Sequence, residues 1–374
     1  MNRQLENLPE LISDIRALIF SARRAAVHSV DLLQVLTNFE IGRRIIDHEQ
    51  QGAERAKYGE TTLLDLAVVL TDEFGRGFSL TNLKLMRQFY LAYRERIGQT
   101  VSGVLPLLQK SQTLSDSLQK PVSPGKMQKS PAQFTLSWSH YVFLLGVKNA
   151  PERSFYEIEA TSQGWSLREL KRQFNTGLYE RLALSRDKDG IRKLAAEGQI
   201  VSRPEDLLKD PYVLEFLGLD ERTKYSESDL ETAIIDKIEH FLLELGKGFL
   251  FEARQKRFTF DEEHFFVDLV FYNRLLRCYV LLDLKIGKLS HQHLGQMQMY
   301  VNYFDRFVKL AGENPTIGIV LCKKKHDALV EITLPQDANI HAKEYQLYLP
   351  DKELLRQKLE EWSEEVGRQA AVGE

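Results

Sequence analysis

The sequence of 374 residues predicts two domains of different class, an all-α N-terminal domain and an α/β C-terminal domain. Up to about residue 95, apolar residues recur three and four positions apart, which is the spacing of amphipathic helices. After residue 229, a helix-like stretch is followed by three strand-like runs, a second helix and two further strand-like runs. That order is typical of a sheet whose middle strands are covered by helices on both faces.

Changes in composition predict where the chain divides. The stretch from 98 to 133 is rich in Ser, Gln, Lys and Pro with little periodicity, which indicates a flexible linker or long loop. We expect a helical N-terminal region at 1–97, the linker at 98–133, helices that complete the N-terminal domain at 134–190, a connection at 191–228, the α/β domain at 229–355, and a C-terminal helix or tail at 356–374.

The N-terminal helices carry the outline of a helix-turn-helix, since LLDLAVVLTDEF is followed by the turn GRGFS and by LTNLKLMRQFYLAYRER. A later helix, in GWSLRELKRQFN, begins with a capping box of Ser166 and Glu169 and is basic in its first turns. Ordinary amphipathic helices with solvated basic faces are the alternative for both segments. Six residues on these helices are candidate contacts to nucleic acid: Asn82, Lys84, Arg87, Arg168, Lys171 and Arg172.

Composition excludes several classes of protein. The formal net charge of −3 gives no global positive field, so a contact to nucleic acid must use local patches. No run of about 18 apolar residues occurs, and the first residues include acids, which predicts a soluble, cytoplasmic protein without a membrane span. Cys278 and Cys322 lie in apolar runs without metal-binding spacing, so neither a disulfide framework nor a zinc site is indicated.

Charged residues interrupt two runs that otherwise read as buried strands. Asp268 lies in HFFVDLVFY, and Asp283 and Lys285 lie in CYVLLDLKI. An ionised group taken from water without partners costs several kcal/mol or more, so each needs a metal, a countercharge or hydrogen bonds. Because side chains alternate along a strand, Asp283 and Lys285 share one face.

A short polar segment joins the two runs, which predicts an antiparallel hairpin with Asp268 and Asp283 on adjacent strands. Two carboxylates about 5 Å apart repel each other unless a cation lies between them, and oxygen ligands suit Mg²⁺ or Mn²⁺. In the preceding helix, predicted from Asp229 to Leu245, Glu231 falls within the apolar stripe and is the carboxylate expected to point toward the sheet. A favourable interaction with the helix dipole is the alternative for Glu231.

These residues resemble the PD-(D/E)XK nuclease superfamily, in which a carboxylate on one strand is followed by D/E-x-K on the next. Asp268 in FVDLV and Asp283-Leu284-Lys285 in LLDLKIG match, although Val267 stands where the pattern has proline. Gln296 and Tyr300 match the Q-x-x-x-Y of some branches. Further segments resemble the YhcG-type family of bacterial proteins over nearly the whole chain outside 98–133: IGRRI, YGETTLL, FGRGFSLTNLKLMRQFY, LSWSHYVFLL, GWSLREL and NPTIGIVLCKKK among them.

The resemblance implies a restriction-endonuclease-like α/β domain and a metal-dependent DNA nuclease with a role in restriction, mobile elements or DNA processing. On this hypothesis Asp268, Asp283, the carbonyl of Leu284 and Glu231 hold Mg²⁺ or Mn²⁺, Lys285 orients water or neutralises phosphate, and Gln296 and Tyr300 act from the next helix. For Tyr300, simple packing is the alternative.

Other interpretations remain open at the level of sequence. A buried Asp/Lys pair explains Asp283 and Lys285 but leaves Asp268 without a role. A catalytically silent nucleic-acid-binding or assembly protein, and a nuclease that cuts RNA, are the rival functions. We also expect a homodimer, because cutting both strands of a duplex needs two sites, and the chain leaves room for an activating protein partner.

Overall fold

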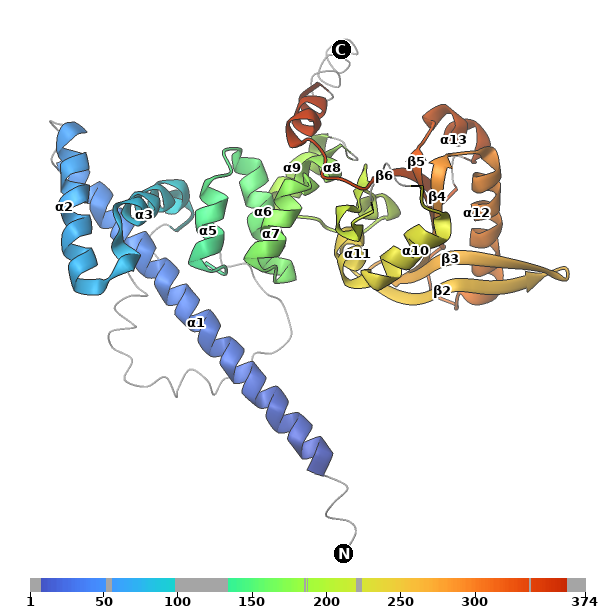
Figure 1. Cartoon of the computed structure of the whole chain (residues 1–374), viewed down its shortest axis with the longest axis horizontal. Helices are drawn as coiled ribbons and strands as arrows, with labels where there is room; N and C mark the ends of the chain where they lie inside the picture. The colour runs from blue at the N-terminus through green and yellow to red at the C-terminus, as the bar shows by residue number, and fades with distance from the viewer. Residues whose placement is uncertain are drawn as a thin grey trace, which may run out of the picture. The chain divides into compact units, whose positions relative to one another are not determined.

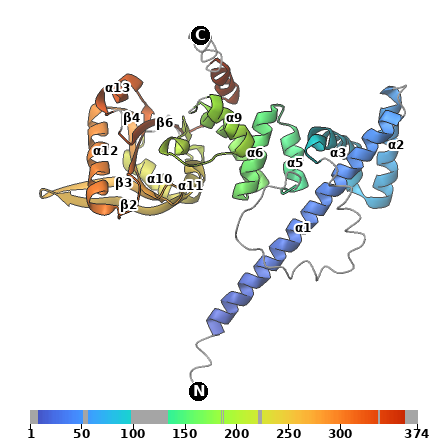
Figure 2. The ribbon, with the colours of Figure 1, turned by 180° about the vertical axis from the view of Figure 1, so that it is seen from behind.

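The computed structural model describes residues 8–51, 56–97, 134–184, 186, 188–219, 224–335 and 338–361. The predicted linker lies outside these residues, as does the predicted tail after residue 361. The chain divides into two compact units, Met1–Arg153 with Ala160–Leu167, and Ser154–Glu159 with Arg168–Glu374 (Figures 1 and 2). No helix in the described ranges is long and apolar enough to cross a bilayer. The boundaries expected from composition stay predictions.

The described part of the first unit is helical, as the sequence predicts. It contains α1 (Leu8–Gln51), α2 (Ala56–Phe74), α3 (Leu80–Tyr93), α5 (Trp138–Leu145) and part of α6 (Ala150–Gln163), with short 3₁₀ turns at Arg76–Phe78 and Arg94–Ile97. An aromatic cluster joins α1, α3 and α5: the ring of Phe89 lies 5.9 Å from that of Phe39 and 5.0 Å from that of Tyr141.

Glycine permits the close approach of α1 and α3. A Cβ atom at Gly42 would lie only 2.1 Å from the carbonyl oxygen of Met86, so a larger residue would force the two helices apart. The segment predicted as a helix-turn-helix forms α2, a turn and α3, and the hydroxyl of Ser79 caps α3 by accepting a hydrogen bond from the Asn82 amide. That this pair of helices reads DNA stays a prediction.

The second unit is built around a mixed sheet in the order β1-β6-β5-β4-β3-β2, which confirms the predicted α/β class. Strands β2, β3 and β4 pair antiparallel, whereas β4, β5, β6 and β1 pair parallel. The predicted hairpin is confirmed, with Leu269 opposite Leu282. The strands are β1 (Tyr212–Val213), β2 (Phe249–Phe260), β3 (Glu263–Asn273), β4 (Cys278–Lys288), β5 (Ile317–Lys324) and β6 (Ile340–Gln346).

Helices cover both faces of this sheet (Figure 1). On one face α10 (Glu227–Asp236) and α11 (Ile238–Leu245) bury apolar side chains such as Leu230 and Phe241. On the other face α12 (His291–Tyr303) buries apolar side chains, and α13 (Asp327–Thr333) packs partly buried ones against the same cluster. The unit also contains α7 (Leu167–Asn175), α8 (Leu178–Ala183), α9 (Lys188–Glu197), 3₁₀ turns at Pro204–Leu207 and Glu215–Leu217, a π-helical turn at Phe304–Val308, and helical residues 352–361.

The single helix predicted from Asp229 to Leu245 is wrong, because Lys237 separates α10 from α11 with φ −119° and ψ 30°. The two halves pack on different strands, α10 on β4 and α11 on β2. Strand β3 lies between these two, and each strand of a sheet is rotated by roughly 20–25° from the next, so one straight helix could not follow both. The spacing of apolar residues in the sequence does not show how the strands beneath the helix are rotated, so it could not predict the break.

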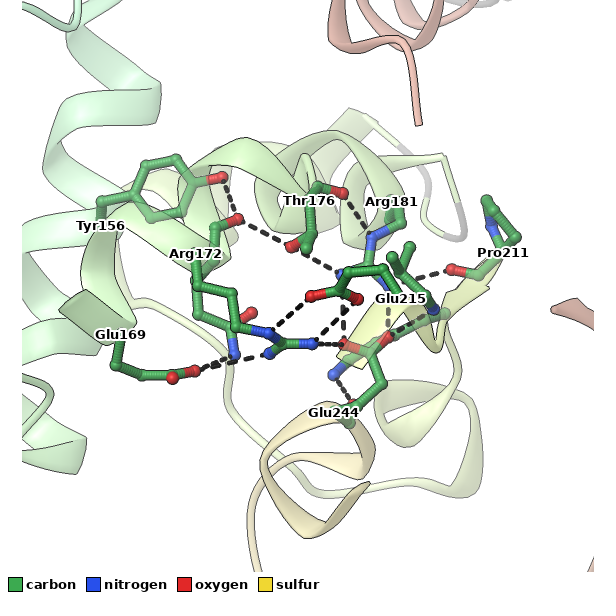
Figure 3. Close-up of polar contacts among 11 residues, drawn as sticks. Tyr156, Glu169, Arg172, Thr176, Arg181, Pro211, Glu215 and Glu244 are labelled. Carbon is green, nitrogen blue, oxygen red and sulfur yellow. Dashed lines mark hydrogen bonds and ion pairs between the residues drawn. The ribbon is translucent and has the colours of Figure 1, made fainter. Parts of the chain in front are cut away.

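A buried ion pair ties α8 to α11 within the second unit (Figure 3). The side chains of Arg181 and Glu244 are both 0% exposed, and Arg181 Nη1 donates to Glu244 Oε1 at 2.5 Å. Arg181 also donates to the carbonyl oxygens of Thr176 and Pro211, each at 2.9 Å. The Val213 amide donates to Glu244 Oε1 at 3.0 Å, so the carboxylate holds strand β1 as well.

Charge compensation keeps Glu244 ionised in this interior. Burial alone would raise the pKa of Glu244, but the nearby charges of Arg181, Lys209 and Arg172 outweigh burial and lower it. Lys209 donates to the backbone carbonyl of Glu244, and burial lowers the pKa of Lys209 to about 8. The pair is therefore stable only while its partners are in place.

We predict that Arg181→Ala lowers the free energy of unfolding by about 3–5 kcal/mol, because Glu244 would lose its main countercharge in the interior. Urea unfolding of the full chain measures this. Arg192→Ala is the matched control: its pair with Asp189 is 82% and 80% exposed, and its loss should change stability by less than about 0.5 kcal/mol. Equal effects of the two substitutions would contradict the assignment of a structural role to the buried pair.

Candidate active site

The structure brings the predicted catalytic residues together at one region of the second unit. Asp268 comes from β3, and Asp283, Leu284 and Lys285 come from β4. Glu231 comes from α10, and Gln296 and Tyr300 come from α12. Hydrogen bonds described below, some of them through the backbone or through Gln255 of β2, connect these elements.

Asp268 is held across the hairpin by the neighbouring strand. Its Oδ2 atom accepts a hydrogen bond of 2.8 Å from the backbone N–H of Leu284, and its Oδ1 atom accepts one of 3.0 Å from Gln255 Nε2. The regular pairing of β3 with β4 ends at Leu269 and Leu282, next to this contact. Where the two strands begin to separate, the Asp268 carboxylate therefore accepts the hydrogen bond of the Leu284 N–H, a backbone donor that would otherwise need another acceptor.

Asp283 is the most deeply buried carboxylate of the site, with the residue 2% exposed. Its Oδ2 atom lies 3.0 Å from Lys285 Nζ, yet none of the described residues donates a hydrogen bond to it in good geometry. Burial raises the pKa of Asp283 to about 7, and the neighbouring charge of Asp268 contributes in the same direction. The ionised form of Asp283 is thus short of positive charge even with Lys285 beside it.

Lys285 lies between two acidic groups. Burial would lower its pKa, but Asp283 outweighs that effect and the pKa is raised, so the ammonium stays charged. Its Nζ atom also lies 3.4 Å from Glu227 Oε2 at the start of α10, where the glutamate side chain is 45% exposed. The exposed Glu227 can turn to solvent and leave Lys285 available to an anion.

Glu231 is buried against the sheet, 4% exposed, where its place in the apolar stripe of the helix predicts it. Two residues of β2 hold it: Arg254 Nε donates to Oε1, and Gln255 Nε2 donates to Oε2 at 2.5 Å. Because Gln255 also donates to Asp268, it bridges the two carboxylates. Gln255 has φ 46°, a left-handed conformation that non-glycine residues rarely adopt, and such strain is concentrated at functional sites.

Sequence reasoning missed Arg254, Gln255 and Glu227. They lie in segments whose patterns are those of an ordinary exposed strand and an ordinary capped helix start. Nothing in those patterns sets Gln255 apart, because its role follows from a backbone conformation and from partners 13 and 24 positions away.

Tyr300 supports the site from α12. Its hydroxyl donates to the carbonyl oxygen of Phe266 at 2.8 Å and accepts a hydrogen bond from Gln296 Nε2. Burial raises the pKa of Tyr300 to about 12, so the hydroxyl keeps its proton and remains a donor. The pair fixes β3 two residues before Asp268, which gives Tyr300 both a packing and a positioning role. His293 forms the capping box of this helix with Ser290.

The predicted nucleic-acid contacts lie in different settings. On α3, Asn82 bonds to the Gly77 carbonyl and the Trp138 indole, and Arg87 pairs with Glu49 at 2.9 Å. Lys84 is exposed, as are Arg168 and Lys171 on α7.

Arg172 differs from its neighbours on α7, since its side chain is only 15% exposed and lies in the network of Figure 3. Its guanidinium donates to Glu215 at 2.8 Å and lies within 4 Å of Glu169 and Glu244. Three carboxylates thus already surround the guanidinium of Arg172, which the sequence suggested as a contact to phosphate.

The residues of the site fit a divalent cation. Four carboxylates face two cationic side chains, so the fully ionised site carries a surplus of two negative charges: Asp268, Asp283, Glu227 and Glu231 against Lys285 and Arg254. In the side-chain positions described, no three His, Cys, Asp or Glu groups converge as a ligand cluster. The carboxylates of Asp283 and of the adjacent Asp268 nevertheless offer hard oxygen ligands of the kind that Mg²⁺ and Mn²⁺ prefer.

Fold and site together define a class of protein. A mixed sheet between helices, with a carboxylate on one hairpin strand and Asp-Leu-Lys on the next, is the arrangement of the PDDEXK nucleases. Residues 205–360 match the family model described as the YhcG PDDEXK nuclease domain, and residues 14–181 match the DUF1016 N-terminal domain.

The particular family follows from a full-length relative. The chain is 44% identical over 344 residues to the protein named "Putative nuclease YhcG" of Escherichia coli (strain K12), and the alignment covers 91% of each chain. The chain therefore belongs to the YhcG family, as its sequence motifs predict.

Two solved structures also resemble parts of this chain. A crystal structure of a repair endonuclease from Pyrococcus abyssi matches with 16% identity and a TM-score of 0.23, covering 35% of this chain and 50% of that chain. The structure titled EndoMS-dsDNA2 complex matches with 15% identity and a TM-score of 0.24, covering 36% and 50%. These values are too low to add to the family assignment.

The raised pKa of Asp283 predicts how stability depends on pH without divalent metal. The carboxyl has an ordinary pKa of 3.8 when unfolded and about 7 when folded, so the folded protein binds the extra proton. The free energy of unfolding should therefore fall by at least about 1 kcal/mol between about pH 5 and pH 8, and Asp283→Asn should remove this part of the slope. Urea unfolding in EDTA measures it, with exposed Asp189→Asn as the control, and an unchanged slope in Asp283→Asn would contradict the prediction.

Proposed function

We propose that this protein is a divalent-metal-dependent nuclease that hydrolyses phosphodiester bonds in DNA. The observation that carries the proposal is the buried carboxylate of Asp283, which lies 3.0 Å from Lys285 Nζ and whose pKa is raised to about 7 by burial and by the neighbouring Asp268. A sheet held together by a simple Asp/Lys pair would not need a second aspartate that raises the pKa of the first.

Asp268, Asp283, the Leu284 carbonyl and Glu231 are the groups that would hold Mg²⁺ or Mn²⁺. Such a cation polarises a phosphoryl oxygen and lowers the pKa of a bound water. Gln255 and Arg254 keep Asp268 and Glu231 oriented toward the site when no cation compensates them. Tyr300 and Gln296 hold β3 from α12, because the Tyr300 hydroxyl donates to the Phe266 carbonyl.

Lys285 is the residue that would meet the negative charge of the phosphate. Its ammonium is charged, it is close to Asp283, and its second neighbour, Glu227, is partly exposed. An ammonium at this place stabilises charge that develops on the phosphate oxygens, and one such donor is worth about 100-fold or more in rate when water is excluded.

DNA is the substrate we favour, since the segment predicted as a helix-turn-helix does form two helices joined by a turn. Exposed Lys84, Arg168 and Lys171 are the remaining candidates for contacts to the backbone. A homodimer, an activating partner, a cytoplasmic location and a role in restriction, mobile elements or DNA processing stay predictions from the sequence.

Cleavage of supercoiled plasmid, single-stranded DNA and RNA in Mg²⁺ or Mn²⁺ tests the proposal. We expect the native protein to cut DNA, and Asp283→Asn and Lys285→Met to lower the rate by about 100-fold or more with the fold retained. Asp189→Asn and Lys193→Met, both exposed on α9, are matched controls that should cut like the native protein.

Each alternative has its own outcome in that experiment. Cutting of RNA alone would favour an RNA nuclease. A folded native protein that binds nucleic acid but cuts none of the substrates would favour a silent binding or assembly protein. Unchanged cutting by Lys285→Met would remove Lys285 from the mechanism.

A further inference from the structure

A groove of about 500 Å³ lies beside the candidate active site and is lined by basic side chains. It is formed at the C-terminal ends of β4, β5 and β6, within the second unit. Its lining includes Lys288, Lys323, Lys324, Lys325, His326 and the exposed ring of Tyr348. The whole chain has a net charge of −3, so this accumulation of positive charge is local.

Three of the lysines have no acidic partner. Among the residues that the structure describes, no carboxylate lies within 4 Å of the ammonium groups of Lys288, Lys323 or Lys324. Lys323 is instead held over the ring of Tyr225, 4.8 Å from its centroid. The groove therefore presents a group of uncompensated cations, a feature that a solvated, mixed-charge surface does not need.

The other charged residues of the groove are already engaged. Lys325 pairs with Asp210 at 2.7 Å and with Asp327 at 3.3 Å, which fixes the segment after β5. Glu344, an acid that also lines the groove, accepts a hydrogen bond of 3.0 Å from the Lys325 amide. These contacts position the basic segment and leave the three lysines for an anion from outside.

The groove and the candidate active site share strand β4. Lys285 and Lys288 pair with Cys322 and Lys324, which are two residues apart on β5, so with a bulge between them the two lysines lie about 7 Å apart along the sheet. Glu227, at the start of α10, lies 3.4 Å from Lys285 Nζ.

We propose that this groove binds the phosphodiester backbone of duplex DNA on one side of the scissile phosphate. The proposal rests on the proposed nuclease function and names how that site would hold its substrate. On one strand of B-form DNA the charges follow one another at 3.4 Å along the axis, so lysines this close to Lys285 can meet phosphates next to the one at the site. Contacts of this kind fix the register of the duplex without reading its sequence.

The test measures binding apart from cleavage. The full chain in EDTA is titrated into a labelled duplex of about 30 base pairs at salt concentrations between about 50 and 200 mM. The Lys288→Gln, Lys323→Gln and Lys324→Gln triple variant should bind at least about tenfold more weakly, and the slope of log affinity against log salt should fall by about 2 to 3.

The matched control changes net charge equally at exposed positions elsewhere in the same unit: Arg192→Gln, Lys193→Gln and Lys358→Gln. It should keep the native salt slope and bind within about twofold of the native protein. Thermal unfolding confirms that both triple variants are folded.

The proposal is overturned if the triple variant keeps the native affinity and salt slope, or if the control variant loses as much affinity as the triple variant. It is also overturned if the native protein does not bind duplex DNA, or if it binds RNA alone. Cleavage measured in parallel separates the two ideas: groove-dependent binding without cutting refutes the nuclease, whereas cutting with an unaffected triple variant refutes the groove.

Discussion

The buried pair of Arg181 and Glu244 is the contact on which the architecture of the second unit depends (Figure 3). Both side chains are inaccessible to solvent, so the cost of removing two charges from water is recovered only when their geometry and hydrogen bonds are complete. Glu244 lies on α11, which leads directly into β2, and β2 supplies Arg254 and Gln255 to the candidate active site. The helices before residue 205 are thus part of the support of the nuclease sheet.

The buried carboxylates of the candidate active site differ from Glu244 in their balance of charge, and their pKa shift has the opposite direction. Around Glu244 the cations are sufficient, and its pKa is lowered in spite of burial. Around Asp283 they are not, and its pKa is raised to about 7. The structural network is therefore electrically complete in itself, whereas the candidate catalytic carboxylates keep a surplus of negative charge, which is the physical difference between the two.

The candidate active site and the basic groove both include residues of strand β4. β3 and β4 separate at Asp268, which opens the site, and β4 then continues past Lys285 to Lys288 beside β5. One strand therefore carries both Lys285 and the groove residue Lys288, and the bulge between them sets their separation. A rigid element of this kind positions charges more precisely than a loop would.

The sequence by itself determined the helical and α/β classes, the β3–β4 hairpin, and the shared face of Asp283 and Lys285. These features depend on the spacing of apolar residues and on charged residues within apolar runs, both of which are local properties of the sequence. It also identified Glu231 as the inward carboxylate, because helical angle alone decides that.

Only the tertiary structure decided which partners these residues meet. The break at Lys237 follows from two strands at different angles, the commitment of Arg172 follows from Glu215 and Glu244, and Gln255 gains its role from Glu231 and Asp268. Each of these contacts joins residues 13 to 72 positions apart in the chain. Packing of whole elements brings such residues together, and no window of sequence long enough to define one helix or strand contains that information.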